Sequence, residues 1–287
     1  MSVINTVFKV SEMFTKNPEF VSINYENLEK VANKMLEEGK IDFFSKESKE
    51  NYQDLNYTNE IKLELLASSI NYCYWYGKPD IRPANSSSTL MYGLLVDNYN
   101  KNNRQIDMKM INNFVADMAE ARFPLIEERA RHLVQTASRW EGFVNEINNN
   151  KKEVGPLINL MVREFPGFAS DMFLKRASLF FLQLGRKFEW FKETIGDLHI
   201  PADYQVPKML KYFGVLEYSE MLSTQIQTYS LIPAGSLMEC EIRAATVVVS
   251  RKLAESTGWI TPEVDTWFWT KRKECDDPFH LTITTDY

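Results

Sequence analysis

The chain has 287 residues, of which 44% are apolar and 13% aromatic, so it carries enough apolar side chains for a sizeable buried core. Its net charge of −6 and pI near 5.3 argue against a broad basic face for nucleic acid, although a local basic patch remains compatible with them. No stretch of about 18 consecutive apolar residues occurs, so we expect neither a signal peptide nor a membrane-spanning helix.

The cysteines and histidines give no sign of a bound metal. Cys73, Cys240 and Cys275 show no paired spacing and leave one thiol over, and His132 has no second ligand type at a suitable distance along the chain. The simplest interpretation is a cytoplasmic protein with reduced thiols. We therefore expect no metal site and no cofactor.

Apolar residues at helical spacing predict a largely helical first half. The aromatic run from Asn71 to Tyr76 is the exception, and its alternation favours a strand or extended segment that ends in a turn over 77–79. The charged run Glu127 to Arg131 is typical of a solvated helix face. The predicted elements are helices over 26–38, from 58 onward, over 90–99 after a loop at 85–89, over 106–119 and over 124–147.

The second half predicts a helix over 157–165 that stops at Pro166, and then a helix over 171–184 that is apolar nearly all round. Lys175 and Arg176 interrupt that helix. A lysine in such a setting either extends to solvent or is buried against a carboxylate. Ser236 and Glu239 form an S-x-x-E capping box ahead of a further helix over 240–254.

Asp203 stands at the mouth of a short apolar helix that ends before Gly214. A helix N-terminus presents unpaired N–H groups and a partial positive charge, which favour an ionised carboxylate. The position by itself favours an N-cap whose role is structural.

Three motifs resemble the queuosine-salvage family, the queuosine-nucleotide N-glycosylases. They are ADYQVPKMLKYFGVLEYS (202–219), FLKRAS (173–178) and ECEIRAAT (239–246), with weaker similarity in INYCYW (70–75), PLIEERARHL (124–133), VDTWFW (264–269) and the closing Tyr287. The resemblance covers residues 25 to 287. It implies a mainly α fold in a single domain over 1–287, similar to the helical DNA-glycosylase folds, with residues 1–24 as a peripheral N-terminal extension.

The resemblance also implies roles for individual residues. Asp203 and Lys175 correspond to a catalytic pair, and Asp265 corresponds to a carboxylate that reads the base. The predicted substrate-binding set is Asp265, Thr266, Trp267, Pro201, Thr270 and Arg243. An ionised carboxylate suits this chemistry because positive charge develops at the anomeric carbon as an N-glycosidic bond breaks.

Two positions depart from the family pattern. Pro201 stands where an aromatic residue precedes the Ala-Asp pair, and Thr270 stands where many relatives carry a second Asp. Asp265 is also compatible with a plain N-cap after Thr261-Pro262. The predicted catalytic pair is retained, whereas the predicted base-reading set is altered.

Three hypotheses follow from the sequence. The first is hydrolysis of a modified purine nucleotide, of the 7-deazaguanine or queuosine type, which releases the free base. The second is a glycosylase that excises a modified base from DNA in repair or anti-phage defence, with Lys187, Lys208 and Lys211 as a local basic stripe. The third is a non-catalytic protein that binds a modified nucleotide. None of the three requires a membrane.

Overall fold

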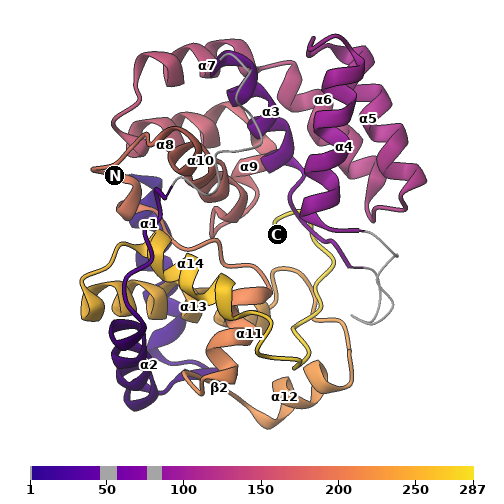
Figure 1. Cartoon of the computed structure of the whole chain (residues 1–287). Helices are drawn as coiled ribbons and strands as arrows, with labels where there is room; N and C mark the ends of the chain where they lie inside the picture. Colours follow the sequence, from indigo (N-terminus) through magenta and orange to yellow (C-terminus); the bar gives the residue numbers. More distant parts are fainter. Residues whose placement is uncertain (1, 46–56, 76–85) are drawn as a thin grey trace.

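A computed structural model describes residues 2–45, 57–75 and 86–287 of the chain. Helices dominate these residues, as the sequence predicts, and one two-stranded sheet accompanies them (Figure 1). The helices are α1 (Val3–Lys16), α2 (Tyr25–Glu38), α3 (Tyr57–Ser69), α4 (Ser88–Lys101), α5 (Met108–Glu120), α6 (Ile126–Ala137), α7 (Trp140–Asn149), α8 (Val154–Glu164), α9 (Pro166–Ala169), α10 (Lys175–Phe188), the 3₁₀ turn η3 (Ile195–Asp197), α11 (Gln205–Tyr212), α12 (Glu220–Gln227), α13 (Leu237–Thr257) and α14 (Thr261–Lys271).

The helices form two packed groups that share α13. In Figure 1 the upper group holds α3 to α10, with α10 packed on α3 and α8, and the lower group holds α1, α2, α11 and α14 around α13. Two buried apolar clusters follow these groups, except that α1 contributes Ile4 and Val7 to the cluster of the upper group. Helix α13 contributes Ala244 to one cluster and Ala245 to the other. Burial on nearly every side explains how α13 keeps the β-branched run Thr246–Val249 helical despite its weak helix propensity.

The small sheet ties the N-terminal region to the middle of the chain. Strand β1 (Val21–Ile23) pairs antiparallel with β2 (Leu216–Tyr218), with Val21 opposite Tyr218. Behind it, the buried Glu241 carboxylate accepts backbone N–H groups from Glu19 (2.9 Å), Phe20 (2.7 Å) and Val21 (3.0 Å). Helix α1 packs against α13, and its Ile4 and Val7 belong to the core.

Two predicted helices have different bounds in the structure. The helix predicted over 124–147 is two helices, α6 and α7, because the chain breaks at Arg139, whose φ of −129° and ψ of −2° are not helical. The helix predicted over 171–184 begins only at Lys175, because the Asp171 carboxylate accepts the backbone N–H groups of Phe173 (2.9 Å) and Lys175 (2.7 Å). Leu174 between them has a positive φ of 54°.

Three smaller predictions also need correction. Residues 71–75 form no strand, and the turn predicted over 77–79 lies outside the described residues. Arg129, from the run predicted to face solvent, is fully buried and donates to the carbonyl oxygens of Pro124, Ile70, Tyr72 and Cys73. Only half of the predicted capping box forms, since Ser236 caps Glu239 N–H but the Glu239 carboxylate accepts from Gly235 (3.0 Å).

No helix in the described part of the chain is long and apolar enough to cross a bilayer.

Candidate active site

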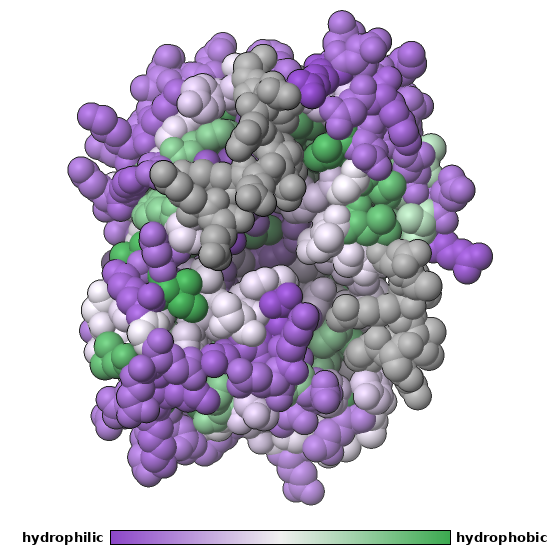
Figure 2. Space-filling view, in the orientation of Figure 1, coloured by the Kyte–Doolittle hydropathy of each residue, from purple (hydrophilic) through white to green (hydrophobic). Residues whose placement is uncertain are grey.

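A cavity of about 410 Å³ opens between the two groups of helices. It lies near the centre of the face in Figure 2, beside the chain end marked C in Figure 1, where Tyr287 lines its wall. Its volume suits a ligand of nucleotide size. The lining residues are Asn71, Tyr72, Tyr74, Ser87, Ser88, Thr89, Tyr92, Lys175, Leu179, Gln183, Arg186, Pro201, Asp203, Tyr204, Gln205, Val206, Asp265, Thr266, Trp269, Arg272 and Tyr287.

Helix α10 forms one side of this cavity. Lys175, Leu179, Gln183 and Arg186 all line it, and their spacing of four, four and three residues places them on one face of the helix. At a rise of 1.5 Å per residue, this row extends over about 16 Å. A cation therefore stands at each end of the row, and an apolar and an amide side chain lie between them.

Lys175 begins α10 and is 4% exposed, so it does not extend to solvent. Its ammonium group donates to Asn71 through the backbone oxygen (2.8 Å) and the side-chain Oδ1 (3.1 Å). Burial lowers the pKa of Lys175 to about 8, although Asp203 acts in the opposite direction. The group is thus charged at neutral pH and close to losing its proton.

Asp203 lines the same cavity immediately before α11. Its Oδ1 accepts the backbone N–H of Gln205 at 2.7 Å, which is an Asx turn rather than the predicted N-cap, since Tyr204 occupies the capping position. Burial raises the pKa of Asp203 above its ordinary value of 3.8, against the opposing effects of Lys175 and of the Gln205 and Val206 N–H groups. The sequence correctly indicated that helix N–H groups favour the charged form of Asp203. It did not indicate that burial, which favours the neutral form, has the larger effect.

Lys175 and Asp203 act on each other electrostatically without forming an ion pair. Each shifts the pKa of the other, yet the Lys175 Nζ and the Asp203 carboxylate oxygens do not approach within 4.0 Å. Opposite charges that face one cavity across such a gap leave room for a reacting group between them.

Asp265 lies in the second turn of α14, so it is not the N-cap that the sequence also allowed, because Ile260 occupies that position. It lines the cavity beside Thr266, whose hydroxyl accepts from Arg186 at 3.1 Å. Burial raises the pKa of Asp265 to about 7, and Asp203 adds to the rise while Arg186 opposes it. Two carboxylates, Asp203 and Asp265, and three cations, Lys175, Arg186 and Arg272, thus line the cavity.

Three residues of the predicted substrate-binding set lie outside the cavity lining. The Trp267 indole is buried and donates to Glu38 at 2.8 Å, and the neighbouring Trp269 lines the cavity instead. Thr270 is exposed, and its hydroxyl donates to the Trp267 carbonyl of its own helix at 2.7 Å. The remaining predicted residues Pro201, Asp265 and Thr266 line the cavity with the catalytic pair.

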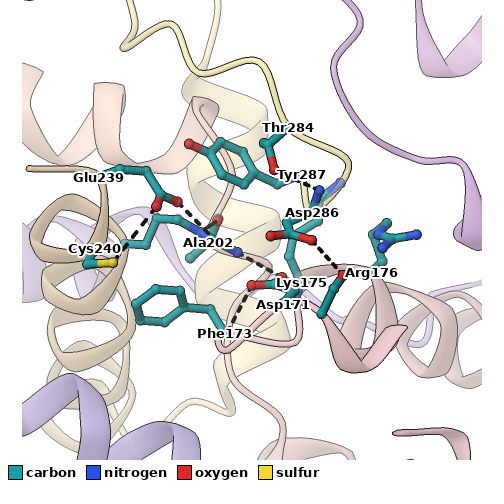
Figure 3. A network of polar contacts seen from close by, with 12 residues as sticks. Asp171, Phe173, Lys175, Arg176, Ala202, Glu239, Cys240, Thr284, Asp286 and Tyr287 are labelled. Carbon is teal, nitrogen blue, oxygen red and sulfur yellow. Dashed lines mark hydrogen bonds and ion pairs between the residues drawn. The ribbon is translucent and has the colours of Figure 1, made fainter. Parts of the chain in front are cut away.

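Arg243 is the third residue outside the lining, and three of its hydrogen-bond partners, Asp171, Glu239 and Ala202, are shown in Figure 3. It is 2% exposed and pairs with Asp171 (2.8 Å) and Glu239 (3.2 Å). Its Nε also donates to the carbonyl oxygen of Ala202 at 2.9 Å, while Asp171 accepts the Lys175 backbone N–H. One guanidinium therefore connects the segment that carries Asp203 to the start of α10.

The sequence did not indicate Arg186, Gln183 or Tyr92 as cavity residues. Arg186 and Gln183 share a helix face with Lys175, and that spacing was the available signal. Tyr92 had no comparable signal, because α4 joins the cavity only through the tertiary packing of α4 on α3.

The three lysines that the DNA hypothesis singled out bind groups of the chain itself. Lys187 donates to Glu60 at 2.6 Å, Lys208 donates to the Cys275 carbonyl at 2.8 Å, and Lys211 lies over the Tyr218 ring. They do not support the predicted basic stripe. Within the described ranges, no three His, Cys, Asp or Glu side chains gather as metal ligands would.

Comparisons with known proteins agree on one family. The sequence model of the family described as "Queuosine salvage protein" matches residues 50–285. A protein of Sphaerobacter thermophilus named "Queuosine 5'-phosphate N-glycosylase/hydrolase" is 31% identical over 193 aligned positions, which cover 58% of this chain and 60% of that protein. A Dictyostelium discoideum protein of the same name is 27% identical over 307 aligned positions, which cover 93% of this chain and 94% of that protein. A Nematostella vectensis protein of that name is 29% identical over 168 aligned positions, which cover 52% of this chain and 48% of that protein. Because the family match covers most of its length, the chain belongs to the queuosine salvage protein family.

Proposed function

We propose that this chain hydrolyses the N-glycosidic bond of a modified purine nucleotide of the queuosine type and releases the free base. The observation that carries the proposal is that Lys175 and Asp203 line one cavity of nucleotide size and affect each other's pKa without a direct ion pair. The relatives' name, "Queuosine 5'-phosphate N-glycosylase/hydrolase", supplies the substrate class.

Asp203 provides the negative charge in this reaction. A water oxygen bonds to the anomeric carbon, the electrons of the carbon–nitrogen bond leave with the base, and one proton of the water ends on the base. Positive charge develops on the sugar as that bond breaks, and a fixed carboxylate stabilises it. The Gln205 N–H holds one oxygen of Asp203 and leaves the other to face the sugar or orient the water.

Lys175 keeps Asp203 in its reactive, ionised form. Its ammonium group opposes the rise that burial causes in the pKa of Asp203. Asn71 fixes that ammonium through two hydrogen bonds, so its position does not depend on the ligand. The backbone oxygen of Asn71 cannot move away without disturbing the buried segment that follows α3.

Asp265 and its neighbours form the base-reading wall. A carboxylate accepts the N1–H and N2–H₂ groups of a guanine-like edge, and those donors favour its charged form, so a bound base lowers the pKa of Asp265. Trp269, Tyr204 and Tyr287 supply aromatic area in the same cavity.

We place the reaction in the cytoplasm, in agreement with three buried and unpaired cysteines.

The test is a substrate panel analysed by mass spectrometry. Wild-type protein is incubated with queuosine 5'-monophosphate, with free queuosine, and with duplex DNA that contains a 7-deazaguanine derivative. The proposal predicts free base from queuosine 5'-monophosphate. Release from DNA alone would establish the DNA hypothesis in its place, and binding of the nucleotide without release would establish the non-catalytic one.

A further inference from the structure

Asn71 is a buried cavity residue whose side chain the proposed chemistry uses only in part. It lies two residues after the end of α3, is 6% exposed and lines the cavity. Its Oδ1 accepts from the Lys175 ammonium at 3.1 Å. Because an ammonium group only donates hydrogen bonds, this contact fixes the orientation of the amide, with the oxygen toward Lys175 and the Nδ2 group on the other side.

The Nδ2 group of Asn71 is a hydrogen-bond donor without a partner. Within the part of the chain that the structure describes, no group accepts a hydrogen bond from it, and the atom keeps some accessible surface. Since Asn71 lines the cavity and its side-chain oxygen is occupied, Nδ2 is the atom left to meet a ligand. A donor in such a buried position is costly unless a ligand accepts from it.

The Lys175 ammonium offers a second donor beside the first. Two of its three N–H groups go to Asn71, through the backbone oxygen at 2.8 Å and Oδ1 at 3.1 Å, and the described residues supply no acceptor for the third. Asp203 acts on the charge of Lys175 and faces the same cavity, but its oxygens do not approach that ammonium within 4.0 Å. Two donors and one carboxylate therefore border the same part of the cavity.

The backbone around Asn71 holds its side chain in place. The Arg129 guanidinium donates to the carbonyl oxygens of Ile70 and Tyr72, which flank Asn71. The Asn71 N–H also donates to the carbonyl oxygen of Ser68 at 3.3 Å. A donor fixed in this way is ordered before a ligand binds. None of these contacts uses the Asn71 side chain, so the side chain can be changed without removing them.

The 2'-hydroxyl of a ribose matches these groups. The anomeric carbon is bonded to the ring oxygen on one side and to the carbon of the 2'-hydroxyl on the other. Positive charge spreads onto the ring oxygen as the glycosidic bond breaks, so hydrogen-bond donors at that oxygen would oppose the reaction. The 2'-hydroxyl can accept from Nδ2 of Asn71 and donate to the Asp203 carboxylate. Hydrogen bonds to this hydroxyl strengthen in the transition state of glycoside cleavage.

We propose that Asn71 binds the 2'-hydroxyl of the sugar and makes the site selective for ribonucleotides over 2'-deoxyribonucleotides. This rests on the proposed function, which places the anomeric carbon at Asp203. The Nδ2 group of Asn71 donates to the 2'-oxygen, and the 2'-hydroxyl donates to Asp203. A nucleotide of DNA lacks this hydroxyl and leaves the Asn71 donor unpaired, so it is a poor substrate.

Two nucleotides that differ in one hydroxyl test the proposal, queuosine 5'-monophosphate and its 2'-deoxy analogue. Base release is quantified by mass spectrometry, and the readout is the ratio of their kcat/KM values. Without a catalyst the 2'-deoxy bond breaks more easily, because the 2'-hydroxyl withdraws electrons from the developing positive charge. Wild-type protein is expected to prefer the ribonucleotide at least tenfold, and contacts of the protein must supply that preference.

Asn71→Ala separates binding of the sugar from support of Lys175. The variant loses Nδ2 but keeps the backbone oxygen that accepts from Lys175 at 2.8 Å. The kcat/KM ratio is expected to fall about tenfold, because the ribonucleotide loses a hydrogen bond that the 2'-deoxy analogue never makes. A weaker hold on Lys175 alone would slow both nucleotides equally and leave the ratio unchanged.

Gln183→Ala is the matched control. Gln183 also brings an amide to the cavity, but it lies eight residues after Lys175 on α10, a rise of about 12 Å. This variant is expected to keep the wild-type ratio. Circular dichroism checks the fold of both variants. If Asn71→Ala does not fold, Asn71→Ser takes its place with the same expected fall, since its hydroxyl ends one bond short of Nδ2.

The proposal is overturned if wild-type protein releases base from the 2'-deoxy analogue as efficiently as from the ribonucleotide, or if the wild-type ratio survives in the Asn71 variant. An equal fall of the ratio in Gln183→Ala would overturn it as well, because that result indicates a general effect of the cavity wall. The proposed function fails on a different observation, the absence of base release from queuosine 5'-monophosphate by wild-type protein.

Discussion

Two buried groups of charges lie on either side of the start of α10, and they differ in how they are paired. Behind the wall, Asp171 and Glu239 contact Arg243 directly. Burial would raise the pKa of Asp171, but Arg243 and two backbone N–H groups outweigh it and the pKa is lowered. In the cavity, burial prevails and raises the pKa of Asp203 and Asp265 while it lowers that of Lys175.

This difference in pairing distinguishes charged groups that stabilise the fold from charged groups that face the cavity. A fully paired network stabilises its charged forms and fixes the backbone around it. Charged groups held apart from their partners are costly to bury, and they remain able to act on a ligand. The same comparison explains Arg243, which the sequence suggested as a substrate-binding residue. It touches both chain segments that carry the proposed catalytic pair, yet it does not line the cavity.

The largest expected effect comes from removing the cation of the fully paired network. Arg243→Met leaves Asp171 and Glu239 buried without a cation, and we expect the free energy of unfolding to fall by about 3–5 kcal/mol, as measured by urea denaturation. The control is Arg251→Met on the same helix, where a more exposed pair with Glu255 at 3.6 Å contributes about 1 kcal/mol or less. If both variants lost the same free energy of unfolding, the buried network around Arg243 would be no more stabilising than an exposed ion pair.

The next effect comes from the cavity side. Lys175→Met is expected to lower kcat on the order of 10²-fold, because Asp203 loses the cation that favours its charged form. In the wild type, activity should fall as pH rises through about 8, since the ammonium is lost there. The measurement is a pH–rate profile, with Lys192→Met on the surface as the control. Activity that stays constant up to pH 10 would contradict the assignment.

A smaller effect is expected in base reading. Asp265→Ala should weaken discrimination between queuosine 5'-monophosphate and its competitors by about 1–3 kcal/mol, the usual range for one bidentate base contact. The ratio of kcat/KM values for queuosine 5'-monophosphate and guanosine 5'-monophosphate measures it. An unchanged ratio would show that the base lies elsewhere in the cavity.

The smallest effect concerns Thr270. Thr270→Asp restores the carboxylate that many relatives carry at this position, which would raise activity on queuosine 5'-monophosphate if the side chain faced the ligand. In the structure the side chain is exposed, bonded to its own helix and outside the cavity lining, so we expect kcat/KM to change less than twofold. A tenfold increase would mean that the C-terminal half of α14 moves toward the ligand.

The periodicity of the sequence predicted most helices but not their interruptions. The buried residues His132, Thr136, Trp140 and Phe143 keep a helical spacing across the break at Arg139, so no change of pattern marks it. Asp171 looked like the first residue of a helix, and only the structure shows its carboxylate capping the chain before Lys175.

That Lys175 and Asp203 line one cavity could be predicted from the sequence, because they lie in two family motifs. The opposite wall could not, since Tyr92 lines the cavity only through the packing of α4 on α3. The burial of the Arg129 side chain could not be predicted for a similar reason. Three of its four partners, the carbonyl oxygens of Ile70, Tyr72 and Cys73, are more than 50 residues away, and no local pattern encodes such contacts.

We propose that Asp203 acts in catalysis and not as a structural cap. The most direct measurement is the free base released from queuosine 5'-monophosphate by wild-type protein and by Asp203→Asn, quantified by mass spectrometry at equal concentrations. The account predicts repeated turnover by the wild type and a rate at least on the order of 10²-fold lower for the variant, with an unfolding free energy that is unchanged or higher. Release by Asp203→Asn at the wild-type rate would contradict it.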